Sequence, residues 1–168
     1  MHTSTVAAEL VIVCFAALVF SAAVKDILTF TIPNRLSLAV ALLYPVHVLS
    51  APYAVDWLPA VGIAAGALAV GFVLFSLRYC GAGDAKLFAA VALWGGPQLI
   101  IQILAYTTLV GGVIALFIWM QHRFARAAAP TLVFQAPADP SIGQQQMPYG
   151  AAIAVAALYV AFTLLRIN

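Results

Sequence analysis

The chain is poor in charged residues. Lysine, arginine, aspartate and glutamate make up 7% of its 168 residues, and 65% of the residues are hydrophobic. Soluble domains carry about 25% charged residues, so a water-facing exterior of ordinary composition is excluded. The mean hydropathy of +1.10 instead indicates an integral membrane protein.

Cysteine and histidine are also scarce. Cys14 and Cys80 are the two cysteines, no Cys-x-x-Cys is present, and His2, His47 and His122 are scattered along the chain. This pattern is not that of a zinc site or a disulfide framework, and it favours neither Ser-His nor Cys-His catalysis. The net charge of +2 comes without a basic stripe, so no nucleic-acid partner is expected. We expect neither a metal nor a cofactor.

Long apolar runs fill the chain, and several approach the roughly 20 residues that a helix needs to cross a membrane. They lack the two-residue alternation of barrel strands, so they predict an all-α, polytopic membrane bundle forming a single domain over residues 1–168. About six transmembrane helices are expected, over residues 6–24, 33–50, 57–77, 83–94, 99–120 and 149–165. The third contains Gly62-x-x-x-Gly66 and Gly71, small residues that predict close helix packing.

One apolar stretch, from Leu87 to Met120, is too long for a single span, and Gly95-Gly96-Pro97 is its natural break. Splitting it there leaves a first helix of about 18 Å, short of the roughly 30 Å hydrocarbon core. Asp84 opens this helix, so we expect it to lie below the membrane surface and to line a water-accessible cavity. Residues 127–148 are predicted to form a surface loop.

The positive charges predict the orientation of the bundle. All but one of the lysines and arginines fall on the same side of the six-helix path, which is cytoplasmic by the positive-inside rule. These residues are Lys25, Arg35, Arg78, Lys86, Arg123 and Arg126. Both termini are then expected outside. Asp26, at the end of the first apolar run, and Asp84 lie at the cytoplasmic edge, whereas Asp56 falls on the opposite side.

Asp26 and Asp84 are the candidate catalytic residues. Ionisable groups at membrane depth are costly, so they indicate function. Two neighbouring carboxyl groups share a proton because like charges resist ionising together. One can then activate water while the other donates to the oxyanion, which predicts hydrolysis of a peptide bond at the membrane surface. Because Asp84 opens a helix and Asp26 closes one, we expect Asp84 to be the ionised base.

The motifs around these aspartates extend over most of the chain. They are Asp26 followed by Ile32-Pro33-Asn34, then Gly81-Ala82-Gly83-Asp84-Ala85-Lys86-Leu87 with Leu93-Trp94-Gly95-Gly96, and finally Met147-Pro148-Tyr149-Gly150-Ala151. Together they resemble the prepilin peptidases, or type IV leader peptidases, which are Gly-x-Gly-Asp membrane aspartic proteases. The resemblance implies that Asp26 and Asp84 form the catalytic pair. It also implies cleavage of the short basic leader of prepilin and pseudopilin precursors, after a glycine that precedes their hydrophobic helix.

The same resemblance implies a bacterial inner (plasma) membrane protein whose active site faces the cytoplasm. Larger bifunctional members carry an added cytoplasmic segment with paired cysteines, linked to N-methylation. This chain has neither the segment nor the cysteines, so it looks like the short peptidases of the tight-adherence (Flp) pilus systems, and methylation is not expected. Precursor pilins and membrane lipid are the expected partners, and the sequence leaves the oligomeric state open.

Eight further residues are expected to bind substrate or shape the site. They are Gly81, Gly83, Lys86, Pro33, Asn34, Pro148, Tyr149 and Gly150. Gly81 and Gly83 are expected to serve backbone geometry. Lys86 either binds a substrate carboxylate or anchors its helix at the interface. The segment Pro148-Tyr149-Gly150 either holds substrate extended or starts a helix.

Two other functions stay open at this point. Presenilin and signal-peptide-peptidase proteins share Gly-x-Gly-Asp, but they place their first aspartate in a Tyr-Asp pair on the preceding helix and carry Pro-Ala-Leu later. This chain has Lys25-Asp26 and Pro-Tyr-Gly instead. A small proton-coupled transporter could use the aspartates as a relay. An inverted repeat would favour it, and none is evident.

Overall fold

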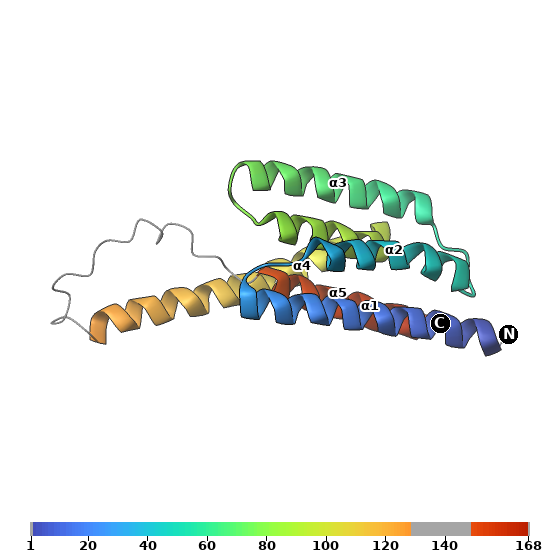
Figure 1. Cartoon of the computed structure of the whole chain (residues 1–168), viewed down its shortest axis with the longest axis horizontal. Helices are drawn as coiled ribbons and strands as arrows, with labels where there is room; N and C mark the ends of the chain where they lie inside the picture. The colour runs from blue at the N-terminus through green and yellow to red at the C-terminus, as the bar shows by residue number, and fades with distance from the viewer. Residues whose placement is uncertain (1, 129–148, 168) are drawn as a thin grey trace.

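The computed structural model describes residues 2–128 and 149–167 as five helices. They are α1 (His2–Thr29), α2 (Asn34–Ser50), α3 (Trp57–Ser76), α4 (Ala82–Ala128) and α5 (Tyr149–Ile167) (Figure 1). No strand occurs within these two ranges. The prediction of an all-α fold is confirmed.

α4 is bent sharply at Gly96. The backbone there is not helical, with φ 55° and ψ −162°, a conformation that a β-carbon would oppose and glycine tolerates. Pro97 follows at once and suits the start of a new helical segment. The predicted break at Gly95-Gly96-Pro97 is confirmed, and the second segment of α4 turns back along the first (Figure 1).

Four helical stretches are long and apolar enough to cross a membrane. They are Val6–Thr29, Trp57–Ser76, Ala82–Gln121 and Tyr149–Ile167. α2 has 17 residues, or about 26 Å, which is less than the roughly 30 Å hydrocarbon core. The chain is therefore a polytopic helical membrane protein, while the count of six spans and the side of the termini stay predictions.

The end of α1 differs from the prediction. A helix ending at Val24 was expected, but α1 continues to Thr29, so Asp26 lies in its last turn and not in a loop. The Phe30 backbone N–H donates to the Asp26 carbonyl oxygen at 2.8 Å, so the helical hydrogen bonds continue past Lys25 and Asp26. Phe30 itself has φ 50°, the left-handed conformation in which helices commonly end.

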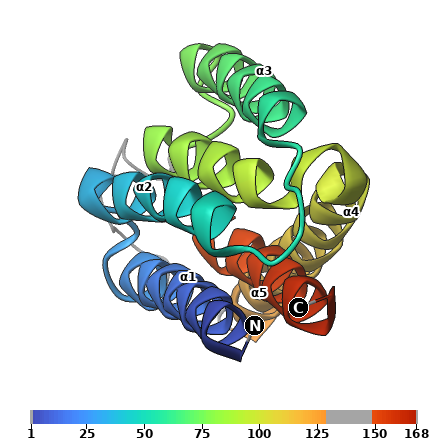
Figure 2. The same ribbon diagram turned by 90° about the vertical axis from the view of Figure 1, so that its right-hand side faces the viewer.

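The helices pack in layers. α1 and α5 lie side by side, α2 and the first segment of α4 lie over them, and α3 lies outermost against α4 (Figures 1 and 2). A β-carbon at Gly71 would lie 2.8 Å from the Ala85 β-carbon, so this glycine lets α3 approach the start of α4. Gly62 and Gly66 have no such neighbour within 4 Å, so their predicted packing role is wrong within the described chain.

An aromatic stack fastens α1, α2 and α4 together in the core. The Trp94 ring lies between Phe15, at a centroid distance of 4.2 Å, and His47, at 5.1 Å. The Trp94 Nε1 group donates to the Val40 carbonyl oxygen at 2.9 Å, which satisfies its only polar atom. Trp94 is thereby held from three sides.

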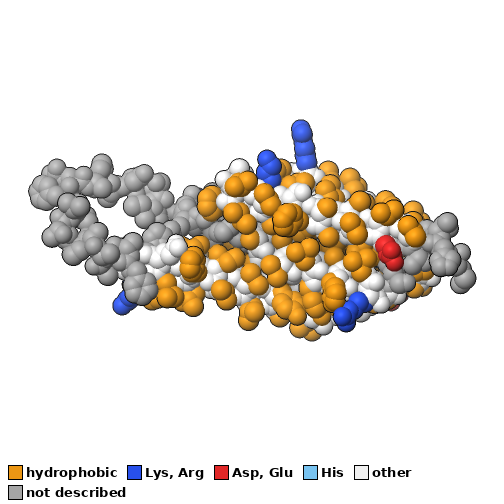
Figure 3. Space-filling model, turned by 90° about the horizontal axis from the view of Figure 1, so that it is seen from below, with side chains coloured by type: hydrophobic (Ala, Val, Ile, Leu, Met, Phe, Trp, Pro, Cys, Tyr) orange, Lys and Arg blue, Asp and Glu red, His pale blue; other side chains and the backbone are white. Residues whose placement is uncertain are grey.

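The outer surface is largely apolar. Large hydrophobic side chains such as Leu49, Ile101 and Leu28 are 87%, 75% and 72% exposed. Figure 3 shows one face of the molecule on which apolar side chains predominate and charged groups are few. Exposed apolar surface of this extent is expected where a helical bundle faces lipid.

Candidate active site

Four helix ends meet at one end of the bundle. Asp26 lies in the last turn of α1, Asn34 begins α2, Asp84 lies in the first turn of α4, and Gly150 is the second residue of α5. The contacts described next bring these four ends together. They include both predicted catalytic aspartates.

Asp26 is buried against the start of α5. Its side chain is 4% exposed, and its Oδ2 atom accepts a hydrogen bond from the Gly150 backbone N–H at 2.8 Å. A β-carbon at Gly150 would lie 2.7 Å from this oxygen and 2.9 Å from the Asp26 β-carbon. Gly150 is therefore required for the close approach of α5 to the carboxyl group.

Asp84 lies at the start of α4, where its carboxyl group folds back over Gly81. A β-carbon at Gly81 would lie 2.9 Å from Asp84 Oδ2, so glycine leaves room for the carboxyl group. The Ala85 N–H donates to the Gly81 carbonyl oxygen at 3.2 Å and fixes this turn. Asp84 is half-buried, and its carboxyl group lies close enough to Asp26 for the two to interact electrostatically.

Ile32 belongs to the motif quoted above, but reasoning from sequence gave it no role at the site. It is 9% exposed, and its side chain packs between the start of α4 and the start of α5. A β-carbon at Gly83 would lie 3.1 Å from the Ile32 β-carbon, and one at Gly150 would lie 2.8 Å from Ile32 Cδ1. Ile32 thus sets the distance between the backbone at Gly83, next to Asp84, and the backbone at Gly150, which binds Asp26. An apolar side chain in a short connection between charged helix ends was the available signal.

Lys86 and Asn34 form a contact that joins α4 to α2. The Lys86 Nζ atom donates to Asn34 Oδ1 at 2.9 Å, and both side chains are exposed. Pro33 precedes this contact in an extended conformation, immediately before α2 and not within its first turn as predicted. The ammonium group of Lys86 keeps donors free for a further partner.

Tyr149 begins α5, but it contacts the second segment of α4. A β-carbon at Gly111 would lie 3.5 Å from the Tyr149 ring, so the ring covers this glycine. The contact favours the helix-start interpretation of Tyr149. Pro148, the other predicted residue of this segment, lies outside the described residues.

The helix ends act on both carboxyl groups. Asp84 lies in the first turn of α4, as expected, but Asp26 also caps a helix N-terminus, that of α5. The positive end of a helix dipole therefore lies at both carboxyl groups. The expectation that Asp84 is the base took into account only the helix that carries each aspartate. Because both aspartates lie at a helix N-terminus, the helix dipole does not distinguish the base from its partner.

Cys80 lies beside the Asp84 turn. Its Sγ atom is 3.7 Å from the Gly71 carbonyl oxygen, and burial together with the nearby Asp84 charge raises the pKa of the thiol above its usual value. The thiol is therefore protonated near neutral pH. Within the described ranges, no three His, Cys, Asp or Glu side chains gather where they could hold a metal ion.

Fold and site together define a class: a polytopic helical membrane protein with two acidic side chains brought together at one end of the bundle. The model of the type IV leader peptidase family matches residues 12–116, which is more than half of the chain. The chain therefore belongs to the type IV leader peptidase family, whose members are peptidases. The match includes Asp26 and Asp84 but ends before α5. A search of curated proteins and a search of solved structures each found no match.

Proposed function

We propose that this protein is an aspartic endopeptidase that removes the leader from type IV prepilins of the tight-adherence (Flp) kind. The observation that carries the proposal is the pairing of Asp26 and Asp84, which come from α1 and α4 and interact electrostatically at one end of the bundle. Family membership supports a leader peptidase over both a presenilin-type protease and a proton-coupled transporter.

The proposed reaction needs no covalent intermediate. The ionised aspartate takes a proton from a water molecule, whose oxygen bonds to the scissile carbonyl carbon. The protonated aspartate gives its proton to the carbonyl oxygen, so a neutral tetrahedral diol forms. The aspartate that took the proton from water then gives it to the amide nitrogen as the C–N bond breaks, and the other aspartate takes back a hydroxyl proton of the diol. The products are a leader ending in a carboxylate and a mature protein with a new amino terminus.

The surroundings of the pair suit such a substrate. The outer surface of the bundle is apolar and can lie beside the precursor's hydrophobic helix within lipid. The basic leader would lie beside the anionic lipids of the cytoplasmic leaflet, which attract positively charged segments. Cleavage after a glycine, on pilin and pseudopilin precursors alike, follows from the resemblance of the motifs and is part of the proposal.

Lys86 is proposed to bind an acidic group of the precursor. Its ammonium group uses one donor on Asn34 and is exposed at the start of α4, two residues from Asp84. Gly81, Gly83 and Gly150 are proposed to shape the site by their small size, as the contacts above indicate.

The test is co-expression of a Flp precursor with the wild type, with Asp26→Asn or with Asp84→Asn. Each variant should abolish the leader-sized mobility shift, because neither aspartate alone can both activate water and protonate the carbonyl oxygen. Glu9→Gln is the matched control, since Glu9 is an exposed acidic residue of α1 far from the site. Normal trimming by either asparagine variant, with the membrane level of the enzyme unchanged, would contradict the proposal.

A further inference from the structure

Phe30 follows α1 in a conformation that few side chains adopt. Its φ is 50°, in the left-handed region where a β-carbon is strained, and glycine or asparagine is the usual residue at such a helix end. The turn is tied by side chains on both sides of Phe30. The Thr29 hydroxyl donates to the Lys25 carbonyl oxygen at 2.8 Å, and the Thr29 and Thr31 hydroxyl oxygens lie 2.9 Å apart. Backbone strain that the surrounding structure imposes in this way is often found at functional sites.

Packing inside the bundle does not account for a large side chain at this position. Phe30 is 48% exposed and does not belong to the hydrophobic core. Asparagine or glycine would end the helix with less strain. The phenyl group is therefore available for a contact outside the chain, either with lipid or with substrate.

The position of Phe30 favours substrate. Its backbone N–H donates to the Asp26 carbonyl oxygen at 2.8 Å. Two residues further on, the backbone nitrogen of Ile32 would lie 3.5 Å from a β-carbon at Gly83, the residue before Asp84. Phe30 thus lies in the short segment that leads from one aspartate to the backbone beside the other, at the rim of the candidate active site.

The exposed surface of α1 beside Phe30 is apolar. Phe20, Val24 and Ile27 are exposed, and their spacing of four and three residues places them on one face of the helix. This face leads along α1 to the aspartate end. It suits the hydrophobic helix of a precursor, whereas a basic leader would gain nothing from it.

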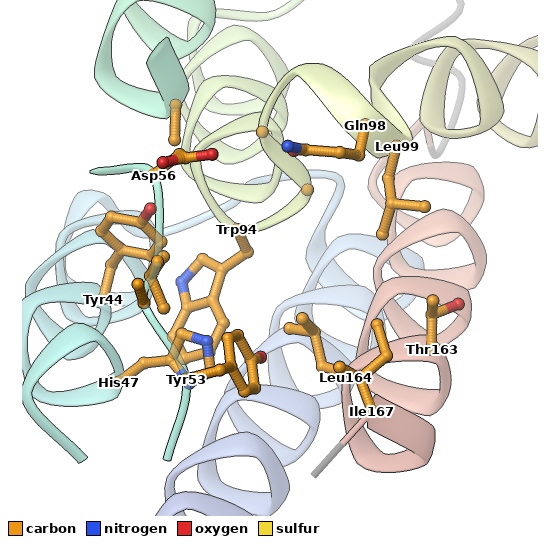
Figure 4. Close-up of a pocket in the computed structure, with 15 residues that line it drawn as sticks. Tyr44, His47, Tyr53, Asp56, Trp94, Gln98, Leu99, Thr163, Leu164 and Ile167 are labelled. Atoms are coloured by element: carbon orange, nitrogen blue, oxygen red, sulfur yellow. The ribbon is translucent and has the colours of Figure 1, made fainter. Parts of the chain in front are cut away.

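The pocket elsewhere in the bundle is in the wrong place for such a contact. It has a volume of about 190 Å³ and lies between the C-terminal parts of α2 and α5 and the bend of α4, with Trp94 and Asp56 in its lining (Figure 4). Asp26 and Asp84 lie instead at the end of α1 and at the start of α4. The residues next to the scissile bond must therefore find their contact at the aspartate end.

We propose that Phe30 is a specificity-determining residue that contacts the first apolar residues after the scissile bond. The inference rests on the proposed peptidase function, because cleavage before a hydrophobic helix brings apolar side chains up to the aspartates. Phe30 shields these side chains from water, while the aspartates carry out the chemistry. Loss of the phenyl group should therefore weaken precursor binding and leave the chemical step unchanged.

The test is precursor cleavage in nanodiscs by Phe30→Asn, with kcat and KM determined separately. Asparagine tolerates the left-handed conformation, so the variant should unfold at a temperature close to that of the wild type. We expect KM to rise about tenfold and kcat to stay within about two-fold. Phe30→Leu keeps an apolar side chain and should restore most of the binding. Leu28→Ala is the matched control, because Leu28 is exposed about 200° around α1 from Asp26 and should leave KM unchanged.

Precursor variants identify the partner of Phe30. Serine is placed, one position at a time, at the first apolar residues after the scissile bond. One such change should raise KM for the wild type and raise it no further for Phe30→Asn, because both substitutions remove the same contact. Unchanged KM in folded Phe30→Asn, or serine effects that add fully to that of Phe30→Asn at every position, overturns the proposal. The peptidase proposal is tested separately by the Asp26 and Asp84 variants, so it stands if only the Phe30 prediction fails.

Discussion

Gly150→Ala tests whether the close approach of α5 to Asp26 matters for catalysis. The added methyl group would lie 2.7 Å from Asp26 Oδ2, 2.8 Å from Ile32 Cδ1 and 2.9 Å from the Asp26 β-carbon. All three contacts are shorter than real β-carbons make, so the carboxyl group and the backbone of α5 must separate. The Asp26 to Gly150 hydrogen bond of 2.8 Å then lengthens or breaks.

The size of the effect follows from the displacement. Ordinary contacts begin at 3.4 Å, so Asp26 must move by about 0.7 Å relative to α5. A misplacement of about 1 Å can lower a catalytic rate roughly 100-fold, and a hydrogen bond to a charged group contributes about 1.5–3 kcal/mol. We therefore expect kcat for leader cleavage to fall about 100-fold.

The assay is cleavage of a precursor in detergent or nanodiscs, with kcat and KM determined separately. Gly62→Ala is the matched control: it adds the same methyl group to α3, where nothing lies within 4 Å, and should leave kcat unchanged. Thermal unfolding of both variants shows whether the bundle is intact. A folded Gly150→Ala protein with kcat within about two-fold of the wild type would refute the reasoning that this contact positions Asp26.

Three further predictions concern the surroundings of the site. Arg78 lies two residues beyond the end of α3 with φ 63°, where glycine is preferred, so Arg78→Gly should stabilise the protein by about 1 kcal/mol in thermal unfolding, and a lowered Tm would contradict this. With Cys14 replaced by alanine, Asp84→Asn should shift the alkylation of Cys80 to lower pH, because it removes a charge that raises the thiol pKa; an unshifted profile would show Asp84 to be neutral or remote. Lys86→Met should raise KM for the precursor and change stability by less than about 0.5 kcal/mol, since its bond to α2 is exposed; the reverse result would make Lys86 a structural anchor.

The helices were predictable because local chemistry decides them. Uninterrupted apolar runs in lipid must be helical, and Gly96 followed by Pro97 cannot continue a helix, so both the class and the bend follow from the residues alone. Counting spans placed Asp26 and Asp84 on the same side of the membrane, and the resemblance implied that they form a pair. Each of these inferences uses only residues that are neighbours in sequence, or the fact that successive spans cross the membrane in opposite directions.

The details that sequence could not supply depend on contacts between distant segments. α1 continues through Lys25 and Asp26, and its backbone hydrogen bonds run without a break to Phe30. The helix can include these charged residues because they lie at the end of the bundle. The bond from Gly150 to Asp26 joins residues 124 positions apart, so the effect of α5 on this carboxyl group could not be read from either helix alone. Ile32 was passed over for the same reason, since its neighbours at Gly83 and Gly150 come from two other helices.

The first segment of α4 connects the Asp84 end of the bundle to the pocket at the bend. Asp84 begins it and Trp94 lies near its end, ten residues further on, or about 15 Å along a helix. Trp94 is clamped between Phe15 of α1 and His47 of α2. Both Trp94 and His47 also line the pocket at the bend of α4. Because this stack also holds α1, which carries Asp26, we expect it to keep α1 and α4 in place relative to each other. Asp56→Asn changes the pocket lining but not this stack, so it should leave kcat for leader cleavage unchanged, and a fall in kcat would show that α4 moves independently of α1.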